Sequence, residues 1–236
     1  MMEITGPKQF DLGGVLGYGW GVMKANFWFL VGVVLVVGLL PQVFYSMGDI
    51  AKKMELGKVE CMIISTVSMI AGYALNYVLQ IGAIKISLGF CDERRAAFST
   101  LFAAGGCFWR FIGVLILQML IVLGGLILLI VPGIIWGIKF SLANYFVIEK
   151  GMGPIEALKA SATATYGVKW DLFGFWIVCG AIIVAGLLCL IVGIFAAVPT
   201  VMVAQALVYR QLAAQSGFGG GEIPEFPHLS SGDATV

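Results

Sequence analysis

Lys139 is the residue whose position most clearly calls for a chemical partner. It is the only charged residue between Phe111 and Ile148, a run of 38 residues, and a cation near the centre of a bilayer costs about 3 kcal/mol. A lipid phosphate, a ligand anion, a water-filled cavity or backbone carbonyls could balance this charge. Alternatively, the lysine snorkels towards the outer headgroups, as long cationic side chains do. The sequence leaves both interpretations open.

Amide side chains in the apolar runs form a second candidate set. Amides in spanning helices commonly hydrogen-bond to a neighbouring helix and contribute about 1 kcal/mol, which is the structural explanation. The functional explanation is a polar pathway, because transporters place polar groups where internal repeats meet. With Lys139, the candidate intramembrane polar site comprises Asn76, Asn144 and Gln205; the other amides are Gln80 and Gln118.

Residues suited to catalysis or metal binding are scarce. The chain has one histidine, His228, and its five cysteines form no C-x-x-C pair, so neither a zinc ligand set nor a disulfide framework is expected. Ser161, Thr163 and Thr165 have no histidine or carboxylate pair near them in sequence to act as a base. The G-x-G-x-x-G and Walker patterns are also absent. We therefore expect no catalytic, cofactor-binding or metal-binding residues, and no enzyme activity.

The composition indicates a membrane protein. Of the 236 residues, 60% are apolar and 11% are charged, and the mean hydropathy is +1.00. Soluble domains are about half apolar and a quarter charged. The formal net charge of +1 argues against nucleic acid as a partner, because nucleic-acid binders carry a clustered basic excess. The expected partners are the lipid bilayer and other membrane proteins, with a homo-oligomer as a further option.

Six segments are long enough to span a bilayer, which takes about 20 apolar residues. Two apolar runs, residues 111–148 and 172–208, are about twice as long as one span and must fold back. We place the first turn at Pro132 and Gly133, since proline interrupts a helix and glycine favours a turn. The second turn is expected between Gly193 and Pro199. We therefore predict an all-α polytopic membrane protein with six transmembrane helices, at about 27–47, 61–88, 111–131, 132–149, 172–192 and 194–214.

The distribution of lysine and arginine predicts the orientation. With the N-terminus inside, nine of these residues lie on the inner side and three on the outer side, so the positive-inside rule predicts that both termini are in the cytoplasm. The membrane domain then covers residues 1–215, and residues 216–236 form a disordered cytoplasmic tail. The inner residues are Lys8, Lys24, Arg94, Arg95, Arg110, Lys150, Lys159, Lys169 and Arg210, and the outer residues are Lys52, Lys53 and Lys58.

A short amphipathic segment with an aromatic and basic end precedes each odd-numbered span. We predict three interfacial helices on the cytoplasmic side, each leading into a hairpin of two spans, as a pseudo-threefold repeat. The second and third units align at an offset of 61 residues, with Gly125 matching Gly186 and Asn144 matching Gln205. Chance similarity among apolar residues is the alternative. The anchors expected in the headgroup layer are Trp28, Trp109, Arg110, Lys169 and Trp170.

Glycine recurs at every fourth position of the first amphipathic segment. Gly13, Gly17 and Gly21 form either a close-packing face for another helix or a frayed, flexible segment. The second interpretation follows because each internal glycine costs about 1 kcal/mol relative to alanine.

Several motifs resemble those of a known group. They are the opening LGYGWGVMKANFWFLVG, the block from ILLIVPGIIWGIKF to EALKAS, and VKWDLFGF. On these residues the chain resembles bacterial integral membrane proteins related to the membrane domain of glycerophosphoryl diester phosphodiesterases, together with six-span relatives of unknown function. The resemblance implies a six-span helical architecture. In relatives fused to a phosphodiesterase, catalysis belongs to a separate soluble barrel with histidine and carboxylates at a metal, which we do not expect in this chain.

Two classes of function remain. The first is a non-enzymatic accessory, assembly or organising subunit that acts through contacts with lipid or membrane proteins. It is favoured by the scarcity of ionisable groups in the spans and by the cytoplasmic rim that three interfacial helices would form. The alternative is a small transporter or channel for a lipid-like or anionic solute, using Lys139 and the amides.

Overall fold

The computed structural model describes residues 10–53, 57–92, 97–189 and 193–219, and all regular structure in them is helical. Six candidate spans are long and apolar enough to cross a membrane, which confirms the all-α, six-span class. Lys8, Arg94, Arg95 and the tail from residue 220 lie outside the described residues. The elements are α1 (Leu12–Ala25), α2 (Phe27–Lys53), α3 (Lys58–Cys91), η1 (Phe98–Phe102), η2 (Gly105–Cys107), α4 (Phe108–Leu128), α5 (Ile130–Phe140), α6 (Ala143–Lys150), α7 (Pro154–Ala164), α8 (Lys169–Leu188) and α9 (Ile194–Gln215).

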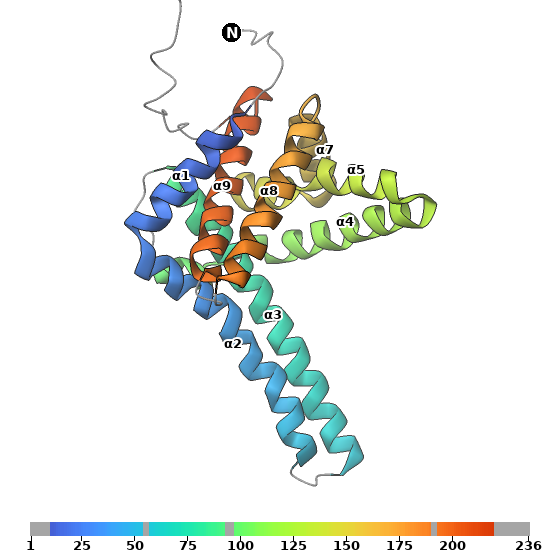
Figure 1. The fold of residues 1–236 in the computed structure, drawn as a ribbon. Helices are drawn as coiled ribbons and strands as arrows, with labels where there is room; N and C mark the ends of the chain where they lie inside the picture. Colours follow the sequence, from blue (N-terminus) through green and yellow to red (C-terminus); the bar gives the residue numbers. More distant parts are fainter. Residues whose placement is uncertain (1–9, 54–56, 93–96, 190–192, 220–236) are drawn as a thin grey trace, which may run out of the picture.

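Three helical hairpins extend from a common packed centre (Figure 1). They are α2–α3, α4–α5 and α8–α9. We call this centre the hub; it consists of α1, α6, α7, most of α9, and the ends of α3 and α4 nearest to them. We call the three hairpins arms. Figure 1 shows that the α2–α3 and α4–α5 arms point away from the hub in different directions. The apolar core therefore lies in the hub, while much of the surface of each arm stays exposed.

The first amphipathic segment forms α1, which packs along α9 (Figure 1). Asp11 caps its N-terminus, because the two carboxylate oxygens accept from the backbone N–H groups of Gly13 at 3.0 Å and Gly14 at 2.8 Å. The buried positions are Val15, Gly19 and Met23, each four residues apart. This spacing places one face of α1 against protein.

The glycine that lets α1 approach α9 is Gly19. A Cβ atom there would lie 2.5 Å from the Thr200 carbonyl oxygen, whereas a Cβ atom at Gly17 or Gly21 would meet no other atom within 4 Å. The interpretation of Gly13, Gly17 and Gly21 as the close-packing face was therefore wrong. Those glycines lie on the exposed side of the helix. Residues three or four apart share one face of a helix, whereas Gly19 is two residues from both Gly17 and Gly21 and lies on a different face.

The second amphipathic segment differs from the expected interfacial helix. It forms two short 3₁₀ helices, η1 and η2, and Gly105 between them has a left-handed φ of 55°. Leu101 is fully buried, and its backbone lies so close to Gly82 of α3 that a side chain at Gly82 has no room. The η1 segment packs on α3. The Gly105-Gly106 pair interrupts the helical conformation before α4 begins.

The third amphipathic segment forms α7, as a helix that begins with Pro154. The Glu156 carboxylate accepts from the Gly153 backbone N–H at 3.4 Å and so caps the first turn. One face of α7 is buried in the hub, through Ala157, Leu158, Ala160, Ser161 and Ala164. This helix therefore supports neighbouring elements as well as forming part of the surface.

The two predicted turns lie earlier in the chain than expected. The first is at Leu129, which is extended with φ −166° and ψ 147° between α4 and α5. Pro132 instead occupies the first turn of α5, where its missing N–H costs no hydrogen bond. Pro199 lies inside α9, since α8 ends at Leu188 and α9 begins at Ile194. Neither proline marks the point of reversal, because the reversals depend on close backbone approach at glycines.

Paired glycines close the second and third hairpins. A Cβ atom on Gly125 would lie 2.9 Å from the Cα of Gly133, and a Cβ atom on Gly186 would lie 2.9 Å from the carbonyl carbon of Gly193. Gly125 and Gly186 are the residues that the 61-residue offset equates. Their equivalent roles support the repeat over chance similarity.

The fourth span is divided into α5 and α6 at Ser141 and Leu142. Ser161 of α7 satisfies backbone groups on both sides of the break. Its Oγ donates to the Lys139 carbonyl at 2.9 Å and accepts from the Leu142 N–H at 3.3 Å. Thr165, directly after α7, places its Oγ1 3.2 Å from the same carbonyl and 2.9 Å from the Ser161 carbonyl, which is the closer acceptor. A broken helix is tolerated at membrane depth where neighbouring groups complete its hydrogen bonds in this way.

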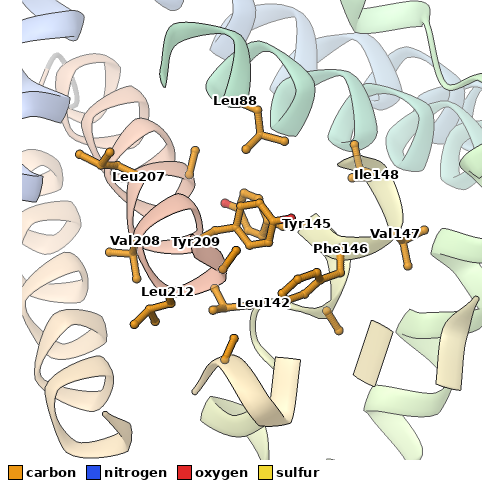
Figure 2. Packing of buried hydrophobic residues seen from close by; sticks show 14 of the residues in the cluster. Leu88, Leu142, Tyr145, Phe146, Val147, Ile148, Leu207, Val208, Tyr209 and Leu212 are labelled. Atoms are coloured by element: carbon orange, nitrogen blue, oxygen red, sulfur yellow. The ribbon is translucent and has the colours of Figure 1, made fainter. Parts of the chain in front are cut away.

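Helices α3, α6 and α9 meet in the core of the hub (Figure 2). The rings of Tyr145 and Tyr209 stack with centroids 5.1 Å apart and planes 21° apart. Phe146 packs edge-on against Tyr209 at 5.0 Å, and Leu88 of α3 lies over the same cluster (Figure 2).

The end of α9 is ordered beyond the predicted start of the tail at residue 216. Gly217 has φ 79°, and the Phe218 N–H donates to the Ala213 carbonyl at 2.9 Å, which is a Schellman cap. The Phe218 ring packs on Phe146 with centroids 5.4 Å apart. Residues 216–219 therefore belong to the hub, and the predicted disorder of residues 220–236 falls outside the described residues.

Candidate functional site: a buried charge cluster and a lysine-lined hollow

Arg210 lies between two carboxylates in the hub and is only 6% exposed. Its Nη2 donates to Asp92 Oδ2 at 2.7 Å, and its Nη1 donates to Glu149. Tyr209 Oη also donates to Glu149, and Lys150 Nζ lies 3.9 Å from Glu149 Oε1. We call Asp92, Glu149, Lys150 and Arg210 the charge cluster. Its two acids and two bases balance each other within the hub.

The charge cluster takes one main member from the end of α3, one from α6, which follows the α4–α5 arm, and one from α9. Asp92 follows the last residue of α3, Glu149 lies in the last turn of α6, and Arg210 lies near the end of α9. Glu149 and Arg210 are 61 residues apart, which is the offset that aligns the second and third units. The cluster therefore joins corresponding positions of the repeat.

The charge cluster links the end of α3, α6 and α9 through ion pairs. Removing one member of a buried ion pair leaves the other charge uncompensated and typically costs about 3–5 kcal/mol. The sequence interpretation missed this site, because it assigned Arg210 to the inner surface and gave no role to Asp92 or Glu149. The available signal was the match of Glu149 with Arg210 at the repeat offset, which pairs opposite charges.

Among the described residues, no hydrogen bond joins the members of the predicted intramembrane polar site. Asn76 Oδ1 accepts from Gln80 Nε2 at 2.6 Å on the same helix. Gln205 Oε1 accepts from Tyr145 Oη at 3.4 Å, while the buried Oδ1 of Asn144 has no hydrogen-bond partner among the described residues. The hollow beside Gln205 measures about 20 Å³, room for about one water molecule. A polar pathway through these amides has no support in this arrangement.

Lys139 lies at the hub end of α5, away from the α4–α5 turn. It lines an open hollow of about 390 Å³ together with Lys169 at the start of α8 and with Ala162, Thr163 and Tyr166 from α7 and its C-terminal end. Its Nζ lies 5.3 Å from the centre of the Phe140 ring. The structure thus brings Lys139 beside a second lysine, which the sequence interpretation had named only as an anchor.

An apolar groove of about 400 Å³ lies between α5 and α8. Lys169 borders both the groove and the lysine-lined hollow. The remaining groove residues are Val131, Ile134, Ile135, Ile138, Trp170 and Phe173.

The predicted tryptophan anchors occupy equivalent places. Trp28, Trp109 and Trp170 lie at the starts of α2, α4 and α8, and they are 82%, 78% and 79% exposed. Arg110 donates to the Gly151 carbonyl at 2.7 Å, and Lys169 lines the hollow described above. Lys85 of α3, which the sequence interpretation did not consider, donates to the Ala103 carbonyl at 2.5 Å.

Within the described ranges, no group of three or more histidine, cysteine, aspartate or glutamate side chains could hold a metal ion. Buried polar atoms of the hub that lack a hydrogen-bond partner in the described part of the chain include Asn144 Oδ1, Arg210 Nε and Gln211 Oε1.

Comparison with known proteins finds uncharacterised relatives. An uncharacterised protein of Mycobacterium bovis and one of Mycobacterium tuberculosis are each 26% identical to this chain over 164 residues, and a protein from a second Mycobacterium tuberculosis strain is 25% identical. The match covers 69% of this chain and 48% of each relative, so the chain spans about half the length of the curated relatives it matches.

No family model and no solved structure matches the chain. The mycobacterial matches carry no link to glycerophosphoryl diester phosphodiesterases. By its six apolar candidate spans the chain is a multi-pass membrane protein, and it is similar to mycobacterial proteins whose function has not been described.

Proposed function

We propose that this chain is a non-enzymatic subunit of the bacterial cytoplasmic membrane that acts through contacts of its arms with lipid or with other membrane proteins. The observation that carries the proposal is the separation of polar and apolar surfaces. The charge cluster is paired internally in the hub, whereas only 17% of the most apolar window is buried in each of α2, α3 and α8. In α9, which runs through the hub, the share is 67%.

The distribution of exposed groups supports an orientation with the hub towards the cytoplasm. Trp28, Trp109 and Trp170 are exposed at the starts of the three arms, and tryptophan prefers the interface between lipid and water. Lys53 and Lys58 lie at the opposite end of the α2–α3 arm (Figure 1). Since positive residues are more numerous at the hub end, the positive-inside rule favours a cytoplasmic hub.

The resemblance to the membrane domain of glycerophosphoryl diester phosphodiesterases also supports a role without catalysis. In relatives that are fused to a phosphodiesterase, catalysis belongs to a separate soluble barrel. An accessory or organising role for this chain follows the same division between membrane and catalytic parts.

Site-specific photocrosslinking tests the proposal. A photoreactive amino acid replaces Ile127 on the α4–α5 arm, which is 77% exposed, and the control replaces exposed Ile155 on α7 in the hub. After irradiation of intact membranes and purification in mild detergent, we expect a discrete adduct with a membrane protein or a phospholipid at Ile127 and a weaker or different pattern at Ile155.

Two results would overturn the proposal. One is recovery of the protein with neither a stoichiometric partner nor bound phospholipid. The other is solute flux into liposomes that contain the purified protein, abolished by Lys139→Met, which would favour the transporter class instead.

A further inference from the structure

We infer that the hollow between α5, α7 and α8 binds one anionic phospholipid, with its phosphate at Lys139 and Lys169 and an acyl chain in the apolar groove. This inference rests on the proposed function and deepens it, because it names a lipid class and a place for it. Two hollows that share Lys169, the charge of the polar lining and the hydrogen bond at the Lys139 backbone support it.

One hollow is lined by two lysines, and the other is lined almost entirely by apolar side chains. The polar hollow measures about 390 Å³ and the apolar groove about 400 Å³, and each falls in the size range of ligand pockets, about 300–1,000 Å³. Lys169 borders both. A molecule with an anionic head and a hydrocarbon chain can therefore fill both at once, with the head and chain meeting at Lys169.

The polar hollow has a positive lining without an acidic partner. Within the part of the chain that the structure describes, neither Lys139 nor Lys169 forms an ion pair, in contrast to Lys150 and Arg210 of the charge cluster. Asp171 follows Lys169 by two residues on α8 and therefore lies on a different face of the helix. Two lysines that share a hollow without a carboxylate repel each other, and a phosphate between them would relieve that repulsion.

The backbone positions Lys139 for this role. Ser161 Oγ donates to the Lys139 carbonyl at 2.9 Å. This bond ties the last turn of α5 to α7, whose residues Ala162 and Thr163 line the same hollow. The helix break at Ser141 thus places the lysine beside α7 and its C-terminal end.

The depth of the site also suits a phospholipid headgroup. Trp170 lines the groove and is largely exposed at the start of α8, a position typical of the interfacial layer. With the hub on the cytoplasmic side, the hollow lies at the inner leaflet. Each lysine near an anionic membrane surface raises the affinity for anionic lipid by about fivefold.

The test measures lipid binding to the purified full-length protein by native mass spectrometry. Phosphatidylglycerol and phosphatidylcholine with identical acyl chains are titrated in the same detergent. We expect phosphatidylglycerol to bind more tightly, Lys139→Met and Lys169→Met each to weaken its binding by about fivefold, and the double variant to weaken it by about 25-fold. Lys159→Met, an exposed lysine outside the lining of both hollows, is the matched control and should change binding by less than about twofold.

A groove-filling variant separates the head site from the chain site. Ile134→Trp should weaken binding of both lipids, because it occupies the apolar groove without changing the lysines. Thermal unfolding confirms that each variant is folded, so a loss of binding can be assigned to the site.

Three outcomes would overturn the inference. They are equal binding of the two lipids to the unaltered protein, unchanged binding in the double lysine variant, and full displacement of phosphatidylglycerol by inorganic phosphate, which would indicate a site for a soluble anion. Equal binding of the two lipids would contradict this site and leave the proposed accessory function intact. Absence of every lipid and protein contact would instead contradict that function.

Discussion

Glu149 and Arg210 form an ion pair across the hub, and they occupy corresponding positions of the second and third structural units, 61 residues apart. Identical charges at these positions would repel, because the repeat brings the two positions into contact. Opposite charges turn the same geometry into an attraction. Asp92, at the end of the returning helix of the first arm, completes the arrangement through Arg210 Nη2.

The packing of α1 on α9 depends on the missing side chain of Gly19. Gly19→Ala adds a Cβ atom 2.5 Å from the Thr200 carbonyl oxygen, and such overpacking typically costs about 1–3 kcal/mol. We expect thermal unfolding in mild detergent at a lower temperature. Gly17→Ala is the matched control, since its Cβ meets open space and alanine favours the helix by up to about 1 kcal/mol. Equal behaviour of the two variants would show that α1 does not pack on this face.

The break between α5 and α6 depends on Ser161. Ser161→Ala removes the donor to the Lys139 carbonyl and the acceptor for the Leu142 N–H, and a buried polar group left unpaired costs about 1–3 kcal/mol. We expect faster hydrogen exchange at the Leu142 amide and lower thermal stability. Thr66→Ala is the control, because the exposed Thr66 Oγ1 donates to the Met62 carbonyl of its own helix. Unchanged exchange at Leu142 in the Ser161 variant would contradict the role assigned to α7.

The turns of the second and third arms should respond alike to added volume. Gly125→Ala and Gly186→Ala each place a Cβ atom 2.9 Å from a facing glycine backbone, so both should lower the free energy of unfolding by about 1–3 kcal/mol. Gly124→Ala and Gly180→Ala are the controls, with no neighbour within 4 Å of the added atom. A large effect at one turn and none at the other would argue against equivalent roles for these glycines.

The sequence was sufficient to predict the class of fold, because bilayer thickness dictates the length of an apolar span. It did not locate the turn at Leu129, since apolar residues run without a polar mark from Phe111 to Phe140 except at Gln118 and Lys139. Proline was an unreliable guide, because the first turn of a helix such as α5 accepts it without loss of a hydrogen bond.

Amphipathic spacing predicted α1 and α7 as helices but could not distinguish a face that meets lipid from one that meets protein. Both faces require apolar residues at intervals of three and four. The buried side of α1 contains Val15, Gly19 and Met23. Glycine has no side chain, so Gly19 does not extend the apolar stripe that identifies a buried face in the sequence. The close approach to Thr200 appears only when α9 is placed beside it.

The charge cluster was beyond the reach of local patterns. Asp92 and Arg210 are 118 residues apart, and each lies at a helix end where charged residues usually face water. Only the repeat alignment relates Glu149 to Arg210, and it relates no acidic residue to Asp92. Lys139 was identified from its apolar surroundings, but its neighbour Lys169 depends on how α5 and α8 pack.

A double-mutant cycle between Glu149 and Arg210 tests most directly whether the charge cluster joins the arms of the repeat. The free energy of unfolding in bicelles is measured for the unaltered protein, Glu149→Gln, Arg210→Met and the double variant. We predict a coupling energy of about 2 kcal/mol, because each single change leaves a buried group unpaired and the double change removes both. The control cycle pairs Glu149→Gln with Lys53→Met at the far end of the α2–α3 arm (Figure 1), which should be additive within about 0.5 kcal/mol. A coupling energy between Glu149 and Arg210 below about 0.5 kcal/mol would show that this ion pair does not join the units of the repeat.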